Sequence, residues 1–293
     1  MQITVFRSAP ARVVVAVALV AAAFASASVA TAASGVDSAA AKLVPANIKA
    51  KGTVTVASDA SYAPNEFISG GKVVGMDVDL ANAIFPLLGL KVKVVNATFA
   101  TIIPGLSSGK FDVGMSSFTD NKLREKTVNF VDYFEAGTSF FEKSSGGPKV
   151  TNLASICGLK VSVESGTTEQ TDAAAQAKKC KAAGKPADIV ASYPTQSNAN
   201  LALSSGRAQV SMADSPVAAY QVKQSNGAFK LVGQAYGVAP YGIAVPKQDG
   251  TLDKAILAAL KDLVANGKYA AILKTWGVQS GADNHPALNG ATS

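Results

Sequence analysis

Hydrophobic and polar positions along the chain alternate between short apolar runs, typical of buried strands, and longer amphipathic segments, typical of helices. In chain order, the pattern predicts a strand at 53–57, a helix at 77–88, strands at 91–95 and 111–115, a helix at 102–108, a strand at 159–164, and helices at 168–181, 252–265 and 269–276. Strands that alternate with helices predict an α/β fold.

Two pairs of similar segments indicate an internal duplication. Residues 106–117 (LSSGKFDVGMSS) align without a gap to residues 203–214 (LSSGRAQVSMAD), and residues 54–59 resemble residues 161–166. Each long copy has the pattern of a helix end, a glycine stop and a short buried strand. Chance similarity between small-residue segments is the alternative. The duplication predicts two similar α/β lobes that present polar groups at corresponding strand ends.

The order of the segments suggests that one lobe is inserted into the other. We expect lobe 1 to comprise residues 51–138 and to be completed by residues 239–279, with residues 139–238 forming lobe 2 between them. Strand-like runs at 139–143 and 239–246 would make the two crossings. Two crossings suggest a hinge between the lobes.

The N-terminal region has the pattern of a secretory signal. Arg7 and Arg12 precede an apolar run, and small residues lead to Ala32, so we predict a signal peptide over residues 1–32 and export to the periplasm, or to the exterior if the source lacks an outer membrane. A membrane anchor is the alternative, but the apolar run is shorter than the roughly 20 residues of a span. No cysteine stands directly after the expected cleavage point, at the new N-terminus, so we expect no lipid anchor.

Composition predicts unstructured segments at both ends of the folded region and argues against several classes of binding partner. The polar, alanine-rich residues 33–50 predict a flexible lead, and residues 280–293 a disordered tail. The formal charge is +7, yet the lysines are scattered and form no basic stripe with interleaved aromatics, which argues against nucleic acid. The sole histidine, His285, lies in the polar tail. We therefore expect no metal site and no cofactor.

The two cysteines, Cys157 and Cys180, suit a disulfide, because export permits oxidation. The strand 159–164 covers about 20 Å and the helix 168–181 returns over a similar length. The end of the helix therefore lies near the start of the strand. Two free buried thiols are the alternative.

Polar residues at the end of the strand 111–115 are the main candidate for chemistry. Ser117, Thr119 and Arg124 follow this strand, and small ligands bind at the carboxyl ends of strands in open α/β sheets. An arginine fork matches a carboxylate in bidentate geometry. The second copy of the repeat delivers Asp214 at the corresponding place. The segment therefore predicts a site for a small carboxylate.

Residues 51–277 resemble the extracytoplasmic substrate-binding proteins of polar amino acid ABC importers, the bacterial solute-binding protein family 3. The matching stretches are 58–67, 74–80, 103–112, 115–124, 164–168, 212–220 and 240–244. The resemblance implies the two-lobed periplasmic-binding-protein fold, in which the lobes close over a ligand cleft at a hinge.

The resemblance also implies roles for the residues that would bind the α-carboxylate and the α-ammonium of the ligand. Arg124 would grip the ligand α-carboxylate, helped by Thr119 and by backbone amides near Thr119 and Thr168. Asp214 would accept from the α-ammonium together with the Ser117 carbonyl. Because Arg124 is in lobe 1 and Asp214 in lobe 2, a zwitterion would bridge the cleft.

These assignments have structural alternatives. Arg124 could pair on the surface with Glu125 or Asp120, and Asp214 could cap the following helix. The chain also departs from the family pattern in two places. Asn65 stands where the family usually has an aromatic residue, which suggests a more polar wall of the ligand site. Glu169-Gln170 reverses the Gln-Glu order that is commoner in the family, so no ligand role is carried onto Glu169.

The resemblance places Tyr62 and Phe99 beside the ligand side chain and Asp59 near its far end; for both aromatics, ordinary core packing is the alternative. Glu164 occupies the strand end corresponding to Asp59. If both carboxylates face the cleft with no basic neighbour, they favour a cationic side chain first (arginine, lysine or ornithine) and an amide second. Glu164 pointing to solvent is the alternative.

We therefore expect a binding protein that captures a polar amino acid and delivers it, as a monomer, to a membrane permease with its ATPase. The rival is an enzyme resembling cyclohexadienyl dehydratase, for which Glu164 or Asp59 would supply an acid. No nucleophile–base pair is apparent, so we expect no enzymatic activity. A receptor sensor domain would need a span or an output domain.

Overall fold

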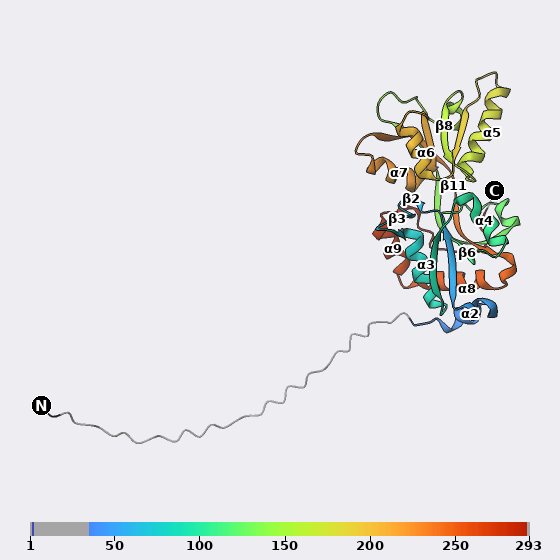
Figure 1. Cartoon of the computed structure of the whole chain (residues 1–293), viewed down its shortest axis with the longest axis vertical. Coiled ribbons are helices and arrows are strands. Elements are labelled where there is room, and N and C mark those ends of the chain that lie inside the picture. Colours follow the sequence, from blue (N-terminus) through green and yellow to red (C-terminus); the bar gives the residue numbers. More distant parts are fainter. Residues whose placement is uncertain (1, 3–34, 292–293) are drawn as a thin grey trace. The chain divides into compact units, whose positions relative to one another are not determined.

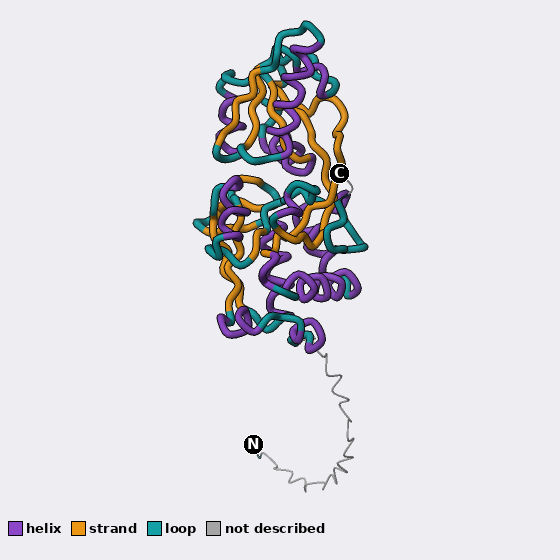
Figure 2. The backbone as a smooth tube through the Cα atoms, turned by 90° about the vertical axis from the view of Figure 1, so that its right-hand side faces the viewer, coloured by secondary structure: helices purple, strands orange, loops and turns teal. Residues whose placement is uncertain are grey.

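Two long strands organise the fold of this computed structural model, which describes residue 2 and residues 35–291. β7 (Val128–Lys143) and β11 (Phe229–Pro246) pair antiparallel and pass through both lobes (Figure 2). They form the centre of an eight-stranded sheet of order β5-β1-β6-β11-β7-β10-β8-β9. Apart from residue 2, the predicted signal peptide lies outside the described residues.

Lobe 1 is built on the end of the sheet that begins with β5. Its strands are β1 (Thr53–Ser58), β5 (Lys91–Asn96) and β6 (Val113–Gly114), with a small separate sheet of β2 (Ser61–Tyr62), β3 (Glu66–Ser69) and β4 (Lys72–Val74). Its helices are α1 (Ser38–Lys42), α2 (Ala46–Lys51), α3 (Met76–Leu87), α4 (Phe99–Ser107), α8 (Leu252–Ala265) and α9 (Lys268–Trp276) (Figure 1). β1 runs parallel to both β5 and β6, so their carboxyl ends meet at one edge.

Lobe 2 repeats this arrangement at the other end of the sheet. Its strands are β8 (Lys160–Glu164), β9 (Ile189–Tyr193) and β10 (Val210–Asp214), and its helices are α5 (Thr168–Ala182), α6 (Gln196–Ser204) and α7 (Ser215–Gln224). β8 runs parallel to β9 and to β10. The duplicated segments thus become equivalent units: β6 corresponds to β10, and β1 to β8.

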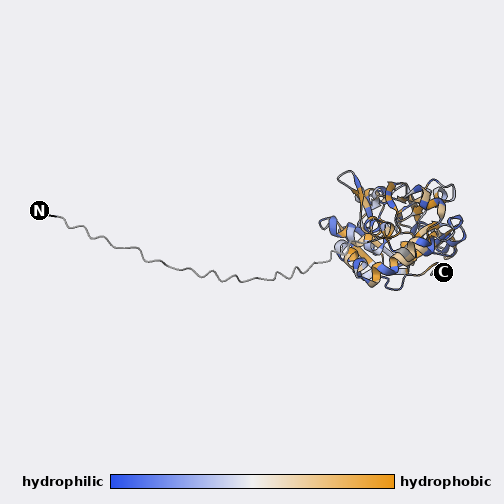
Figure 3. Ribbon diagram, turned by 90° about the horizontal axis from the view of Figure 1, so that it is seen from below, coloured by the Kyte–Doolittle hydropathy of each residue, from blue (hydrophilic) through white to orange (hydrophobic). Residues whose placement is uncertain are grey.

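The apolar faces of helices and sheet form separate cores in the two lobes. In lobe 1, the helix residues Ile84, Phe85 and Leu260 belong to a buried apolar cluster, and in lobe 2 the strand residues Val161, Val163 and Met212 belong to another. Apolar residues gather between the layers, while polar residues colour much of the outer surface (Figure 3). Two α/β lobes joined by β7 and β11 are the architecture that the sequence predicted, and this fold class is confirmed.

The disulfide predicted from the strand–helix return is present. Cys157 and Cys180 are bonded, with their Cα atoms 5.7 Å apart. α5 returns from β8 as its length implied, which brings Cys180 back beside the residues that precede the strand.

The flanks differ from the prediction. Within the lead, expected to be flexible over residues 33–50, α1 and α2 bury Ala40 and Ile48 against the lobe 1 core, because the lead carries apolar residues at helical spacing. Within the tail, expected to be disordered from residue 280, Ala282 and Leu288 form β-bridges to β7. The tail is held largely by backbone pairing, which its polar composition does not reveal.

Two further differences concern strand lengths. The runs predicted at 139–143 and 239–246 are only the ends of β7 and β11, and the strand predicted at 111–115 is regular only over β6. No helix within residues 35–291 is both long and apolar enough to span a bilayer.

Candidate ligand-binding site

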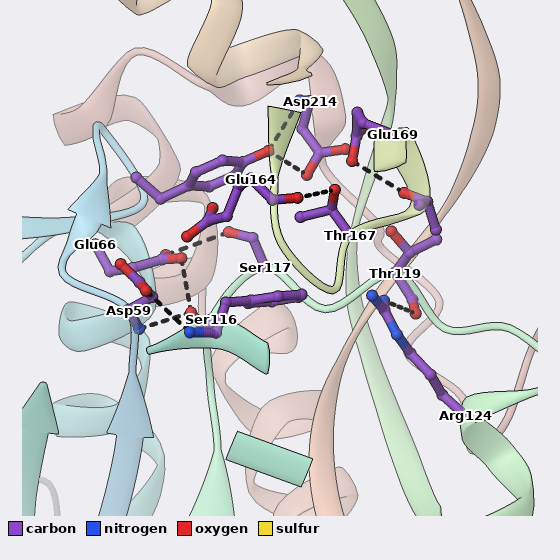
Figure 4. A pocket seen from close by; sticks show the side chains of 13 residues that line it. Asp59, Glu66, Ser116, Ser117, Thr119, Arg124, Glu164, Thr167, Glu169 and Asp214 are labelled. Atoms are coloured by element: carbon purple, nitrogen blue, oxygen red, sulfur yellow. Dashed lines mark hydrogen bonds between the residues drawn. The ribbon is translucent and has the colours of Figure 1, made fainter. Parts of the chain in front are cut away.

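A pocket lies where the strand ends of the two lobes meet (Figure 4). It is lined by Asp59, Tyr62, Glu66, Phe99, Ser116, Ser117, Thr119, Arg124, Glu164, Thr167, Thr168, Glu169 and Asp214. All nine residues singled out from the sequence are in this lining. The structure therefore brings them together, from segments as far apart in the chain as β1 and β10.

Ser117 is held in an unusual backbone conformation at the base of the pocket. Its φ of 51° is in the left-handed region, which a non-glycine residue adopts only when its surroundings impose it. Its amide donates to Asp77 Oδ2 at 2.9 Å, and its hydroxyl accepts from Asn65 Nδ2 at 2.9 Å. Asn65 thus braces the loop and is not among the residues that line the pocket.

Arg124 points its guanidinium at the pocket rather than at a surface carboxylate. Its Nη1 donates to the Thr119 carbonyl at 2.8 Å and its Nη2 to the Gly166 carbonyl at 3.0 Å. The guanidinium also lies 5.4 Å from the centre of the Phe99 ring. Glu125, the expected surface partner, pairs with Lys122 instead. Burial lowers the pKa of Arg124 from its usual value, but a guanidinium remains charged.

The start of α5 faces Arg124 from the other lobe. Thr167 is the N-cap and its hydroxyl accepts from the Gln170 amide, while Thr168 is the first helical residue. A helix N-terminus offers free amides and a partial positive charge. Because Gly166, just before the cap, contacts Arg124, the guanidinium and the helix start define one site that suits a carboxylate.

Asp214 and Tyr62 meet across the two lobes. The Tyr62 hydroxyl donates to Asp214 Oδ2 at 2.9 Å and accepts from the Asp214 amide at 2.9 Å. Asp214 occupies the N-cap position of α7, yet its side chain makes no capping hydrogen bond. Burial, followed by the charge of Glu169, raises the pKa of Asp214 well above its usual range. The carboxylate is therefore destabilised unless a cation reaches it.

Asp59 and Glu164 form a carboxyl pair across the lobes. Each side chain is almost fully buried, and Asp59 Oδ2 accepts from the Phe99 amide at 2.9 Å. Glu164 Oε1 is buried without a hydrogen-bond partner among the described residues. Burial and then the charge of Asp59 raise the pKa of Glu164 well above its usual range. Glu164 thus faces the pocket, and the solvent-facing alternative is wrong.

Four lining residues were not predicted from the sequence. Ser116 and Thr167 are neighbours of predicted residues. Glu66 accepts from Ser116 and Ser117, and Glu169 accepts from Thr138 Oγ1 at 2.7 Å and from Thr168 Oγ1. Glu66 lies in a stretch that carried the family resemblance, and Glu169, onto which no ligand role was carried, directly follows another. Nothing in their spacing distinguishes a buried glutamate from an exposed one.

The pocket has a strong surplus of acidic groups. Its lining holds five carboxyl groups, Asp59, Glu66, Glu164, Glu169 and Asp214, against the single guanidinium of Arg124. Within the described residues no group of histidine, cysteine or acidic side chains is arranged to hold a metal ion. The arrangement can bind a small molecule with one carboxylate at Arg124 and positive charge elsewhere.

Two α/β lobes on a crossing strand pair, with an enclosed polar pocket between them, define a two-lobed solute-binding protein. Residues 54–279 match the model of the bacterial extracellular solute-binding proteins, family 3, and the chain belongs to this family. The resemblance stated from the sequence is confirmed.

Individual relatives agree with this membership. The chain is 32% identical over 249 residues to the arginine-binding protein ArgT of Corynebacterium glutamicum, covering 84% of this chain and 81% of ArgT. It is similar to an ancestral arginine-binding protein bound to arginine, with a TM-score of 0.70, 38% identity, and coverage of 77% and 98%. It is also similar to AncCDT-1, an ancestral amino acid-binding protein described as a precursor of cyclohexadienyl dehydratase, with a TM-score of 0.71, 32% identity, and coverage of 78% and 97%.

Proposed function

We propose that this protein is an extracytoplasmic binding protein that captures a cationic amino acid, arginine first, and delivers it to an ABC importer. The observation that carries the proposal is the distribution of charge in the pocket: one guanidinium beside a helix N-terminus, and five carboxyl groups elsewhere. Arginine-binding proteins among its relatives support the same ligand class. An amide side chain, as in glutamine, is the second choice.

The proposed pose follows from the positions of the charges. The α-carboxylate lies between Arg124 and the first amides of α5, and the α-ammonium lies at Asp214. The side chain passes between Tyr62 and Phe99, and its cationic end reaches Asp59 and Glu164. Each end of the ligand then contacts groups from both lobes, so binding favours the closed arrangement.

We expect binding without chemical conversion. The similarity to a precursor of a dehydratase keeps an enzyme as the competing proposal. The pocket holds carboxyl groups but, among its lining residues, no histidine, cysteine or lysine to form a nucleophile–base pair. We further propose that the mature protein is exported, acts as a monomer, and passes its ligand to a membrane permease that works with an ATPase.

A thermal-shift panel tests the ligand class. The mature protein is screened against the twenty amino acids plus ornithine and citrulline, since a ligand at a hundredfold excess over Kd stabilises by about 2.7 kcal/mol. We expect arginine, lysine or ornithine to give the largest shift. Glutamate binding more tightly than arginine and glutamine would overturn the proposal. Conversion of any shifting amino acid, of arogenate or of prephenate, at a rate abolished by Glu164→Gln, would establish an enzyme instead.

The zwitterion contacts have their own test. Arg124→Ala and Asp214→Ala each leave a buried ligand charge unpaired, and such truncations cost about 2–5 kcal/mol of binding free energy. Arg207→Ala removes an exposed arginine of lobe 2 and is the matched control. Calorimetric titration with L-arginine measures the three variants. If the two pocket variants fold and bind within a factor of three of the control, the assigned site is wrong.

A further inference from the structure

The C-terminal segment, residues 285–291, contacts the loop after β6 that carries Thr119 and Arg124, the proposed carboxylate-binding residues. We call this loop the pocket loop. The Ala291 amide donates to Asp120 Oδ2 at 3.1 Å, and the Gly290 amide donates to Asp132 Oδ2 at 2.8 Å. Asp120 directly follows Thr119, which lines the pocket, and Asp132 lies on β7. Two successive backbone amides therefore tie this segment to the pocket loop and to the sheet at once.

Asp120 and Asp132 each have one buried carboxyl oxygen that lacks a hydrogen-bond partner among the described residues. The residues are almost fully buried, 1% and 2% exposed, and their carboxyl groups lie close enough for the charge of Asp120 to raise the pKa of Asp132. The Oδ1 atom of each has no hydrogen-bond partner among residues 35–291. The other charged groups that act on the pair are Lys122 and Glu125 on the pocket loop, which pair with each other, Arg124 on the same loop, and Asp283.

A single proton held between the two Oδ1 atoms would satisfy both of them. It would also remove one of two adjacent buried charges, which cannot both ionise without a large cost. A metal ion is a poorer fit, because the described residues offer no third acidic, histidine or cysteine ligand there.

We propose that residues 285–291 act as a clasp that positions the pocket loop for ligand binding, and that the clasp is tight when Asp120 and Asp132 share one proton. This positioning role rests on the proposed function. The family match ends at residue 279, so the clasp lies outside the part of the chain that the family model covers.

The contacts of the loop explain why the clasp matters. The backbone of the loop is tethered by the Asp120 amide, which donates to the Pro240 carbonyl at 2.8 Å, and by the bridge between Thr119 and Tyr241. The Asp120 side chain has the clasp as its other tether. The clasp is itself fixed to β7, because Asn289 donates to and accepts from the Phe130 backbone at 3.0 and 2.7 Å. The loop is thus held on two sides.

The sign of the pH dependence follows from the two acids. Burial, and then the charge of Asp120, raises the pKa of Asp132 to about 7, while burial and then Glu125 raise the pKa of Asp120. The shared proton is therefore present below about pH 7 and is lost above it. Its loss leaves two repelling carboxylates beneath the amides, so the clasp loosens as the pH rises.

A proline substitution at position 291 tests the contribution of the backbone N–H separately from that of the Ala291 side chain. Ala291→Pro removes the N–H donor, whereas Ala291→Gly keeps it and is the matched control. Hydrogen exchange of the amides of residues 117–121 reports the loop without any ligand, and titration with L-arginine reports the site. We expect Ala291→Pro, and a chain ending at Asn284, to raise exchange at least fivefold and the Kd for arginine at least threefold relative to Ala291→Gly. Equal exchange in the proline and glycine variants would refute the clasp. Faster exchange with unchanged arginine affinity would refute its positioning role.

The proton is tested with Asp132→Asn, whose amide can donate to Asp120 Oδ1 while its oxygen still accepts from Gly290. Protection of residues 117–121, corrected for intrinsic exchange, is expected to fall in the wild type between roughly pH 6 and 8. It should stay level in Asp132→Asn and fall as in the wild type in His285→Gln, which removes the one histidine of the chain. A level profile in the wild type would refute the shared proton. Failure of the wild type to bind arginine would refute the proposed function, and the exchange measurements would still decide the clasp.

Discussion

The pair of Asp59 and Glu164 makes a sharp prediction about charge selection. Glu164→Gln keeps the size of the side chain and removes the carboxyl group that can ionise against a bound cation. Glu164 is the cleaner position of the two, because its Oε1 has no hydrogen-bond partner among the described residues whereas Asp59 also accepts from the Phe99 amide. The substitution should therefore change the charge of the pocket without disturbing the start of α4.

The expected effect is measured by comparing arginine with citrulline, its neutral near-isostere. A hydrogen bond to a charged group contributes about 1.5–3 kcal/mol, which corresponds to roughly 10- to 100-fold in Kd. Glu164→Gln should weaken arginine binding toward the lower part of this range, because it also relieves repulsion from Asp59. Citrulline has no side-chain charge to lose, so we expect its Kd to change by no more than about threefold.

Calorimetric titration of both ligands into both proteins completes a double-mutant cycle. Glu135→Gln, at an exposed position on β7, is the control for a change in net charge alone. The coupling energy between Glu164 and the ligand charge should be favourable and should shrink at high salt only slightly, since the pair is buried. An arginine-to-citrulline affinity ratio that is the same in Glu164→Gln and in the wild type would refute the reasoning.

The remaining predictions concern stability. Replacing Cys157 and Cys180 by serine should lower the free energy of unfolding by about 3 kcal/mol, because the disulfide links residues that are 23 positions apart in the chain. Denaturant titration of the oxidised protein and of the serine variant measures the difference. Equal unfolding midpoints would contradict the prediction. The ligand-free protein should lose stability as the pH rises from about 5 to 8, because burial raises the pKa of Asp77 to about 6 and that of Asp132 to about 7. The folded state then holds protons that the unfolded chain releases near pH 4, so a rise in stability over this range would show that these carboxyls are not protonated.

The arrangement of the pocket was accessible from the sequence because strand ends carry it. Ser117 closely follows β6 and Asp214 ends β10, the equivalent strand of the duplicated unit. Parallel strands of one lobe share an edge, so residues at these strand ends lie close together. The disulfide followed from a strand and a helix of similar length. These two inferences needed only chain geometry and the periodicity of apolar positions, whereas the placing of Tyr62, Phe99, Asp59 and Thr168 at the site came from the family resemblance.

What the sequence did not reveal depends on burial and on backbone pairing. Glu169 gives no local signal of its burial, because the groups that surround it, such as Thr138, come from a strand 31 residues away. The tail from residue 280 has the composition of a disordered segment, yet Leu288 pairs with Val131 through its backbone. Pairing of this kind depends on a free strand edge, which is a property of the fold and not of the segment.

The acidic pairs link selectivity to closure. Asp59 belongs to lobe 1 and Glu164 to lobe 2, so their repulsion exists only when the lobes approach each other. A ligand shifts the closing equilibrium only by its differential affinity for the two states. A cationic side chain removes the repulsion and therefore gains affinity specifically in the closed state. If the proposed pose is right, an anionic amino acid would reach Arg124 but add to the repulsion on closing, so we expect the conformational change to disfavour it.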